Sequence, residues 1–419
     1  MTALLVASTA VCLLFVVGTA RVGFSGMAAV CGAVSLLSLF GSPVLPESLR
    51  FICVYGALAV LLFGLCLSRE RSSRDTRKWL ISLVLLVFLL LLSTAFQNPA
   101  AVIYYICLFG VYVLGALHGA RMKFQELQGL KMFALCAGFV QTLLAGYEAL
   151  GNPPLIGGYG RYADGTSVLL ENPLLPFDSF RVTGSLGHPI PFSLAVLLCL
   201  AVLHTSNAPV RRPSLKFFLT VWFATFLVLS GTRSAVLCLL VLGLLKGITR
   251  VGAWPTRIVY ILASTAGISI LANILGRASS NIERTGSYTN RSAALQAVPG
   301  LLDRPFLQTL IGNGLGSEDY LRSIGLLQRN GFNVVDNQWV TTLASGGIAC
   351  LLILALILAL KTLSSQGVVA TVVLAFLYMG FVFDFLRWPS VSLYLFVFVS
   401  LSVQANHPPG QGPMPRSLV

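Results

Sequence analysis

The chain has 419 residues, of which 56% are hydrophobic and 10% are charged, and its formal net charge at pH 7 is +14. Its mean hydropathy is +0.85. This composition excludes a soluble globular protein, because too few polar side chains are present to cover the surface of such a fold. We therefore expect a polytopic integral membrane protein. Its fold should be all-α, since only helices satisfy all their backbone hydrogen bonds within one segment in lipid.

Apolar segments recur along the whole chain, and most have the roughly 15 to 20 residues needed to cross about 30 Å of hydrocarbon. They cover residues 2–20, 23–40, 51–67, 79–96, 101–118, 131–150, 187–205, 217–230, 234–246, 258–275, 337–360, 367–384 and 390–404. The pattern predicts about 12 to 13 transmembrane helices. We divide the chain into N-terminal transmembrane helices (1–150), a first large loop (151–186), central transmembrane helices (187–275), a second large loop (276–336), C-terminal transmembrane helices (337–404) and a disordered cytoplasmic tail (405–419).

Clusters of Lys and Arg orient these segments, because short basic loops stay in the cytoplasm. The first cluster lies at 69–78, and later ones lie at 121–131, 211–216 and 246–257. This places both large loops outside the cytoplasm and assigns the whole net charge of +14 to the cytoplasmic side. The charge therefore indicates topology and attraction to lipid headgroups, not nucleic-acid binding. Three crossings before Arg69 place the N-terminus outside as well, unless one of them does not span the membrane.

Several familiar catalytic patterns are missing from the sequence. We find no His, Asp and Glu cluster with metal-ligand spacing, no phosphate-binding P-loop and no Asp-x-Asp pair in either large loop. The glycine run from Gly312 to Gly316 follows no predicted strand, so a tight turn explains it better than a dinucleotide site. All cysteines lie within apolar segments, which predicts neither a disulfide framework nor a cysteine metal site. We expect no metal and no cofactor.

Arginines at the predicted outer boundary are the first candidates for chemistry. Arg233 lies between two short apolar segments, so its guanidinium should reach the depth of a lipid phosphate, where it can bind a diphosphate through paired hydrogen bonds. Arg291 opens an amphipathic stretch that predicts a short interfacial helix. A cation in the first turn opposes the helix dipole, which favours a functional role for Arg291. The alternative for both is an arginine that only anchors a helix end.

Other polar side chains flank the predicted helices. Asp336 opens a long apolar segment, where it can be the helix N-cap, a general base for a hydroxyl proton, or both. Arg181, in the first large loop, is a candidate ligand for phosphate or sugar. His188 is either catalytic or shapes the loop before the next helix starts at a proline. Asp384 and Arg387 should pair at a helix end.

Four of these segments together resemble a known family. They are RVTGSLGHP (181–189), LSGTRSA (229–235), TNRSA (289–293) and DNQWVTTLASGGI (336–348). Their order is similar to that of the O-antigen ligase and polysaccharide polymerase superfamily of bacterial membrane glycosyltransferases, over roughly Arg181 to Leu360. The resemblance implies a GT-C-like fold in the bacterial cytoplasmic (inner) membrane, with an active site that faces outward.

The resemblance also implies roles for individual residues. Arg233 and Arg291 would engage the diphosphate of an undecaprenyl-linked glycan donor. Asp336 stays our own candidate for the general base. The further substrate-binding candidates are Arg181, His188, Thr232 and Asn337. The implied partners are the lipid-linked donor, a glycan acceptor, membrane lipids, and proteins that regulate chain length or flip the donor.

One departure from the family pattern decides between two activities. Ligases of the family carry a His-Asn pair where this chain has Asp336 and Asn337, and an Asp-Asn opening is similar to that of polymerases. We therefore expect a metal-independent, inverting polymerase that joins lipid-linked repeat units, with a ligase that transfers the glycan to lipid A core or protein as the alternative. A transporter or flippase of lipid-linked glycans remains open, although the predicted segment interiors are almost uncharged. A third alternative is a non-catalytic protein of surface-polymer assembly that has kept the fold, and its function would not change when Arg233 is substituted.

Overall fold

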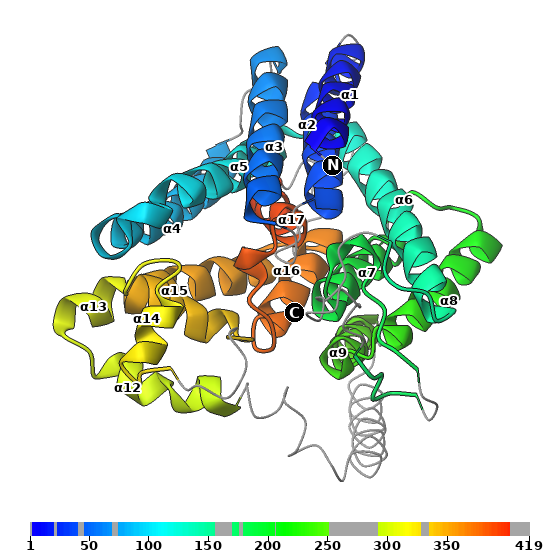
Figure 1. Cartoon of the computed structure of the whole chain (residues 1–419). Coiled ribbons are helices and arrows are strands. Elements are labelled where there is room, and N and C mark those ends of the chain that lie inside the picture. Colours follow the sequence, from blue (N-terminus) through cyan, green and yellow to red (C-terminus); the bar gives the residue numbers. More distant parts are fainter. Residues whose placement is uncertain are drawn as a thin grey trace.

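The computed structural model describes residues 2–20, 23–40, 46–68, 74–155, 170–175, 179–205, 207–250, 292–327 and 335–402. Within these ranges the chain is helical, apart from turns and an isolated antiparallel bridge between Glu171 and Phe180 (Figure 1). The prediction of an all-α fold is therefore confirmed. The predicted segment 258–275, Arg291 and the tail 405–419 lie outside the described residues.

The N-terminal third of the chain forms consecutive helices that match the predicted apolar segments. They are α1 (Thr2–Ala20), α2 (Ser25–Phe40), α3 (Glu47–Leu67), α4 (Arg74–Gln97), α5 (Val102–Arg121) and α6 (Phe124–Ala149). Several begin earlier than hydropathy alone predicts. In α6, the Glu126 carboxylate accepts a hydrogen bond from the Lys123 amide at 3.2 Å, so a polar first turn precedes the apolar part.

The remaining described helices carry the predicted site segments. They are α7 (Pro189–Leu203), α8 (Pro213–Leu229), α9 (Arg233–Arg250), α12 (Val298–Leu302), α13 (Phe306–Ile311), α14 (Glu318–Ser323), α15 (Gln338–Ser364), α16 (Gly367–Met379) and α17 (Pro389–Ser400). Five helices in the described ranges are long and apolar enough to cross a membrane: α3, α4, α5, α6 and α15. The prediction that 367–384 is one apolar helix is wrong at its end, because Gly380 begins a turn that leads to Asp384.

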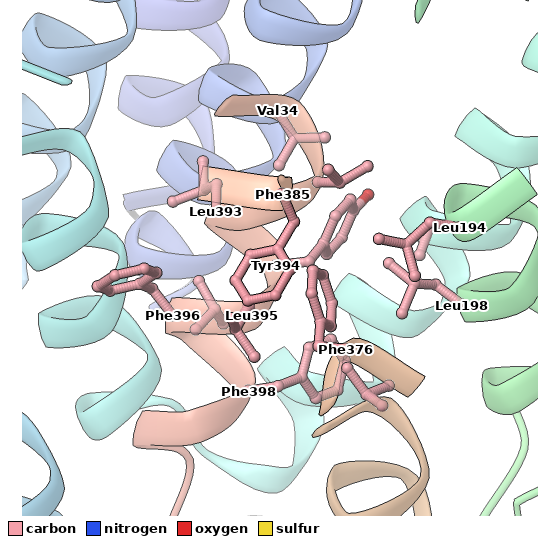
Figure 2. Packing of buried hydrophobic residues seen from close by; sticks show 14 of the residues in the cluster. Val34, Leu194, Leu198, Phe376, Phe385, Leu393, Tyr394, Leu395, Phe396 and Phe398 are labelled. Atoms are coloured by element: carbon pink, nitrogen blue, oxygen red, sulfur yellow. The ribbon is translucent and has the colours of Figure 1, made fainter. Parts of the chain in front are cut away.

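Helix α17 lies at the centre of the core. Every one of its residues is buried, as expected for a helix that is apolar on all sides (Figure 2). Its Phe396 ring stacks on Tyr112 of α5 with centroids 4.9 Å apart. Close packing here requires a glycine in α5, because a Cβ at Gly119 would lie 2.4 Å from the Val397 carbonyl oxygen. The central position of α17 fixes where the preceding turn, with Asp384 and Arg387, is held.

Helix α15 is broken near its start. Gly347 has φ 65° and ψ −167°, a backbone conformation open only to glycine. A Cβ at this position would also lie 2.4 Å from the Leu310 carbonyl, so α13 packs directly on the break. The carbonyls freed by the break are satisfied by another segment: the amides of Asn313 and Gly314 donate to Ala344 and Ser345 at 2.9 Å.

The second large loop differs from its prediction. The sequence predicts 276–336 as loop with one short helix, but its described part, 292–327, contains α12, α13 and α14, which lie beside the first half of α15 (Figure 1). The tight turn predicted at Gly312 to Gly316 is confirmed, since Gly312, Gly314 and Gly316 all have positive φ. This turn is the piece that closes the break in α15.

Candidate functional site

The first large loop and the turn between α8 and α9 meet at Arg181. Its Nε donates a hydrogen bond to the Ser230 carbonyl at 2.9 Å, and its Nη2 donates to Thr232 Oγ1 at 3.1 Å. The Thr232 hydroxyl lies 3.4 Å from the Pro189 carbonyl oxygen. Two segments that the sequence treats separately thus form one polar group. Arg181 and Thr232, both predicted as substrate ligands, use these side-chain atoms to hold the turn.

The turn itself requires glycine. Gly231 has φ +63°, and a Cβ there would lie 2.8 Å from Arg181 Cγ. The preceding helix end is capped from the first large loop, because Asn172 Nδ2 donates to the carbonyls of Val228 and Leu229 at 3.2 and 2.9 Å. Satisfying these last carbonyls allows α8 to end abruptly. The chain therefore reverses within a few residues and places Arg233 at the first position of α9.

Part of the Arg233 guanidinium makes no hydrogen bond, and the adjacent Ser234 hydroxyl is likewise without a partner among the described residues. The arginine side chain is half-buried, and its Nε is buried without a hydrogen-bond partner among the residues that the structure describes. Buried donors in proteins are nearly always paired, so such an atom calls for an explanation. It also lies at the N-terminus of an 18-residue helix, where the helix dipole favours an anion.

His188 has the structural role that the sequence left as one of two options. It precedes α7, and its Nδ1 accepts a hydrogen bond from the Ile190 amide at 3.2 Å. Its ring also lies against Trp388, with centroids 5.7 Å apart. His188 thereby connects the Arg181 group to the turn before α17.

The loop around Arg181 is anchored by a buried acid that the sequence analysis did not select. The Thr183 amide donates to Glu148 Oε2 at 2.6 Å, and the Ser185 amide donates to Gln141 Oε1 at 2.9 Å. Both partners, Gln141 and Glu148, belong to α6. The spacing of Glu148 two turns from Gln141 on one helix face was the available signal.

At the start of α15, the cap is Asn337 and not Asp336. Asn337 Oδ1 accepts from the amides of Trp339 and Val340 at 3.0 and 3.1 Å, and its Nδ2 donates to the Phe381 carbonyl at 3.2 Å. The N-cap interpretation of Asp336 is therefore wrong, and the side-chain amide of Asn337 bonds to backbone groups. Asp336 is half-buried, one residue before the cap.

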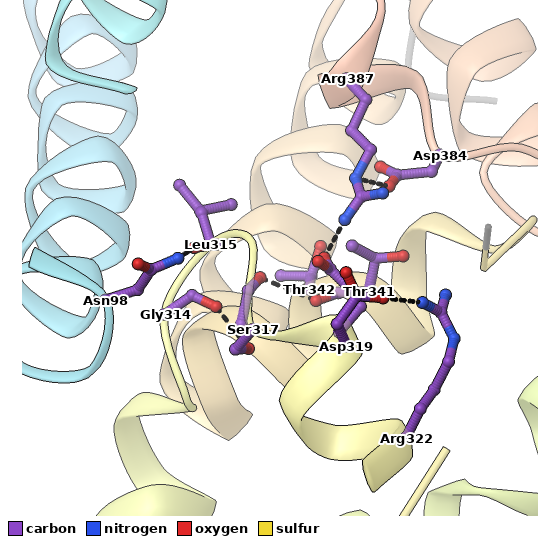
Figure 3. Close-up of polar contacts among 12 residues, drawn as sticks. Asn98, Gly314, Leu315, Ser317, Asp319, Arg322, Thr341, Thr342, Asp384 and Arg387 are labelled. Carbon is purple, nitrogen blue, oxygen red and sulfur yellow. Dashed lines mark hydrogen bonds and ion pairs between the residues drawn. The ribbon is translucent and has the colours of Figure 1, made fainter. Parts of the chain in front are cut away.

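A buried ion-pair group lies beside this helix start (Figure 3). Arg387 Nε lies 2.9 Å from Asp384 Oδ2 in an ion pair, which confirms the predicted pair, and Arg387 Nη2 contacts Glu318 of α14. Burial raises the pKa of Asp384 to about 7, against the opposing effect of Arg387 and with help from Glu318 and Asp336. The two carboxylates outweigh burial at Arg387 and raise the pKa of its guanidinium. Two acids thus share one cation.

This group faces a small cavity between α4, α5 and α15. Its polar lining comes from Tyr105, Gln338, Thr341, Thr342, Ser345, Asp384 and Arg387. Gln338 is fixed on both sides, since its Oε1 accepts from the Leu386 amide and its Nε2 donates to Thr342, each at 2.9 Å. Within the described ranges, no group of three or more His, Cys, Asp or Glu side chains is placed to hold a metal ion.

The helices are those of an all-α membrane protein. It has two polar groups, one around Arg181 and Arg233 and the other around Asp336, Asp384 and Arg387, and the contact between His188 and Trp388 lies between their segments. Comparison with models of known protein families and with curated protein sequences found no match for the chain. An assignment of function therefore depends on the geometry and chemistry of these side chains.

Proposed function

We propose that this protein is a polysaccharide polymerase that joins undecaprenyl-diphosphate-linked oligosaccharide repeat units on the outer face of the bacterial cytoplasmic membrane. The observation that carries the proposal is Arg233. Its buried Nε has no partner in the described part of the chain, while Arg181 beside it is held by Ser230 and Thr232. A diphosphate is the ligand that suits a guanidinium at a helix N-terminus.

The proposed reaction needs charge stabilisation more than covalent chemistry. The attacking sugar hydroxyl forms a new bond to the anomeric carbon of the donor, whose bond to the diphosphate oxygen breaks. Arg233 and Arg291 stabilise the charge that grows on the leaving lipid diphosphate, the kind of contribution that is usually the largest in catalysis. Direct displacement inverts the anomeric carbon.

In this mechanism, Asp336 accepts the proton of the attacking hydroxyl. Support comes from the start of α15, where Asn337 caps the helix through its own side chain and leaves Asp336 outside that role. The nearby Asp384 and Arg387 provide a second acid and a cation on the same side of α15. A GT-C-like arrangement of about 12 to 13 transmembrane helices belongs to the same proposal.

The test is a reconstitution with a defined donor. The purified protein in nanodiscs is given an undecaprenyl-diphosphate oligosaccharide, and the products are separated by size. A ladder of multiples is expected from the wild type and from Arg212→Ala, whose exposed side chain precedes α8, but not from Arg233→Ala. A normal ladder from Arg233→Ala would refute the proposed role of this arginine.

The same assay separates the alternative functions. If the wild type makes no ladder but transfers the glycan once a lipid A core acceptor is added, the protein is a ligase. If it makes neither product and instead moves the donor across a sealed vesicle, it is a transporter. Either outcome would overturn the polymerase proposal.

A further inference from the structure

The second large loop presents an exposed apolar surface, which we call the α13 surface. It consists of Leu302, Phe306, Leu307 and Leu310, whose exposed fractions are 46%, 80%, 59% and 39%. The chain carries no charged side chain between Arg304 and Glu318, although this is a loop between predicted membrane segments. Contiguous exposed apolar side chains of this kind mark an interaction surface.

Contacts with α4 fix the height of this surface. The Leu315 amide donates to Thr94 Oγ1 at 3.0 Å, and the Leu315 carbonyl accepts from Asn98 Nδ2 at 3.1 Å. On its other side, α13 packs on the break in α15, where a Cβ at Gly346 would lie 2.7 Å from Leu90 Cδ2. The glycine turn and the Leu310 end of α13, which packs on Gly347, therefore lie beside the last two turns of α4.

The position of α13 along α4 gives an estimate of its depth in the membrane. Helix α4 ends at Gln97, so Leu90 and Thr94 lie a few residues before its end. With a rise of 1.5 Å per residue, α13 lies about 5 to 10 Å inside the end of a helix that is long enough to cross the membrane. Amphipathic helices that lie in the membrane interface bury their apolar faces to about this same depth.

The two helices beside α13 also expose apolar side chains. On α4, Phe88 and Phe96 are 57% and 71% exposed, and on α15, Leu352 is 56% exposed. These side chains belong to helices of membrane-spanning length and hydropathy. Lipid that covers the upper part of α4 and α15 must therefore meet α13 at the same level.

We infer that α13 is an interfacial anchor, and that its partner is the headgroup and acyl boundary of the phospholipid leaflet at the Gln97 end of α4. The polar side of the segment stays on the protein, where Thr309 Oγ1 donates to the Arg304 carbonyl at 2.8 Å. The anchor sets the depth of the turn at Gly312 to Gly316 and of Glu318 that follows it. It does not depend on the reaction that the protein catalyses.

The inference is tested by photocrosslinking in a bilayer. The variant Phe306→p-benzoylphenylalanine is reconstituted in nanodiscs of phosphatidylcholine and phosphatidylglycerol, irradiated, and analysed by intact mass. Covalent phospholipid adducts are expected. The matched control carries the same probe at Asp319 of α14, which is 91% exposed in the same loop, and should give several-fold less lipid adduct.

Two other results would overturn the inference. A protein adduct of twice the chain mass at position 306 would show that a second copy covers the surface. Equal lipid labelling at positions 306 and 319, or none at either, would show that α13 is not held in the interface. Because Phe306 is largely exposed, the probe does not disturb the core, and a symmetric size-exclusion peak verifies that each variant is folded.

Discussion

Two arginines at the ends of helices illustrate how differently this protein uses the same residue type. Arg304 is buried and saturated: its Nε donates to Leu301, its Nη1 to Asn313 and Ala344, and its Nη2 to Leu343. Burial lowers the pKa of its guanidinium to about 10. Arg233 is half-buried, and its Nε has no partner in the described ranges. One guanidinium holds backbone carbonyls together, whereas the other retains donor capacity for a ligand.

The largest effect on stability should come from removing Arg304, whose three nitrogens all donate hydrogen bonds. Arg304→Ala would leave the Leu343 carbonyl and Asn313 Oδ1 without their arginine donor at the break in α15, and the Ala344 carbonyl would keep only the Asn313 amide. Each buried group left unpaired costs about 1 to 3 kcal/mol, so we expect a loss of about 3 kcal/mol or more in unfolding free energy. The measurement is thermal unfolding in detergent, with Arg212→Ala as the control. A melting temperature equal to that of the wild type would refute the structural role.

The opposite pattern is expected for Arg233. Arg233→Ala should leave the unfolding free energy within about 0.5 kcal/mol of the wild type, because no described hydrogen bond of its Nε is lost. Its polymerising rate should fall by about 100-fold, the typical cost of removing one donor to a developing anion. Arg233→Lys should recover part of the rate, since it keeps the charge but loses the paired geometry. Steady-state product formation measures both variants, and a destabilised but active Arg233→Ala protein would contradict the comparison.

Gly231 tests how strictly the turn between α8 and α9, beside Arg181, requires a glycine. Gly231→Ala places a Cβ 2.8 Å from Arg181 Cγ in a backbone with φ +63°. The left-handed conformation alone costs an alanine about 1 to 2 kcal/mol. We expect that loss of stability together with reduced activity, because Arg233 follows directly. The matched control is Gly243→Ala in α9, where a Cβ has nothing within 4 Å.

A pH dependence of stability is expected from Asp384. Its pKa is raised to about 7 in the folded protein, mainly by burial, and an unfolded aspartate has a pKa of about 3.9. The folded state therefore binds the proton more tightly, and the stabilising contribution of this carboxyl is lost as pH rises from about 4 through 7. Asp384→Asn, which mimics the protonated form, should lose less stability than the wild type between these pH values. Parallel melting curves of the two proteins at pH 5 and 8 would contradict this titration.

Local patterns were sufficient for the helices and insufficient for the contacts between them. Hydropathy predicted α5 and α7 within a turn of their observed bounds, because the preference of an apolar segment for lipid depends only on its own side chains. The same argument selected Arg233 at the start of α9. It missed the roles of Glu148 and Glu318, whose partners Thr183 and Arg387 are distant in the sequence.

The sequence by itself determined an all-α chain with helices long enough to cross a membrane. The free energy of moving a segment from water into lipid depends on the length and composition of that segment alone. The tertiary structure decided which polar side chains are engaged in hydrogen bonds within the fold. It assigned the cap to Asn337 and not to Asp336, closed the break at Gly347 with a distant glycine turn, and committed Arg181 while leaving Arg233 Nε unpartnered among the described residues. Such choices depend on which carbonyls and amides meet across the fold, and no local pattern encodes those meetings.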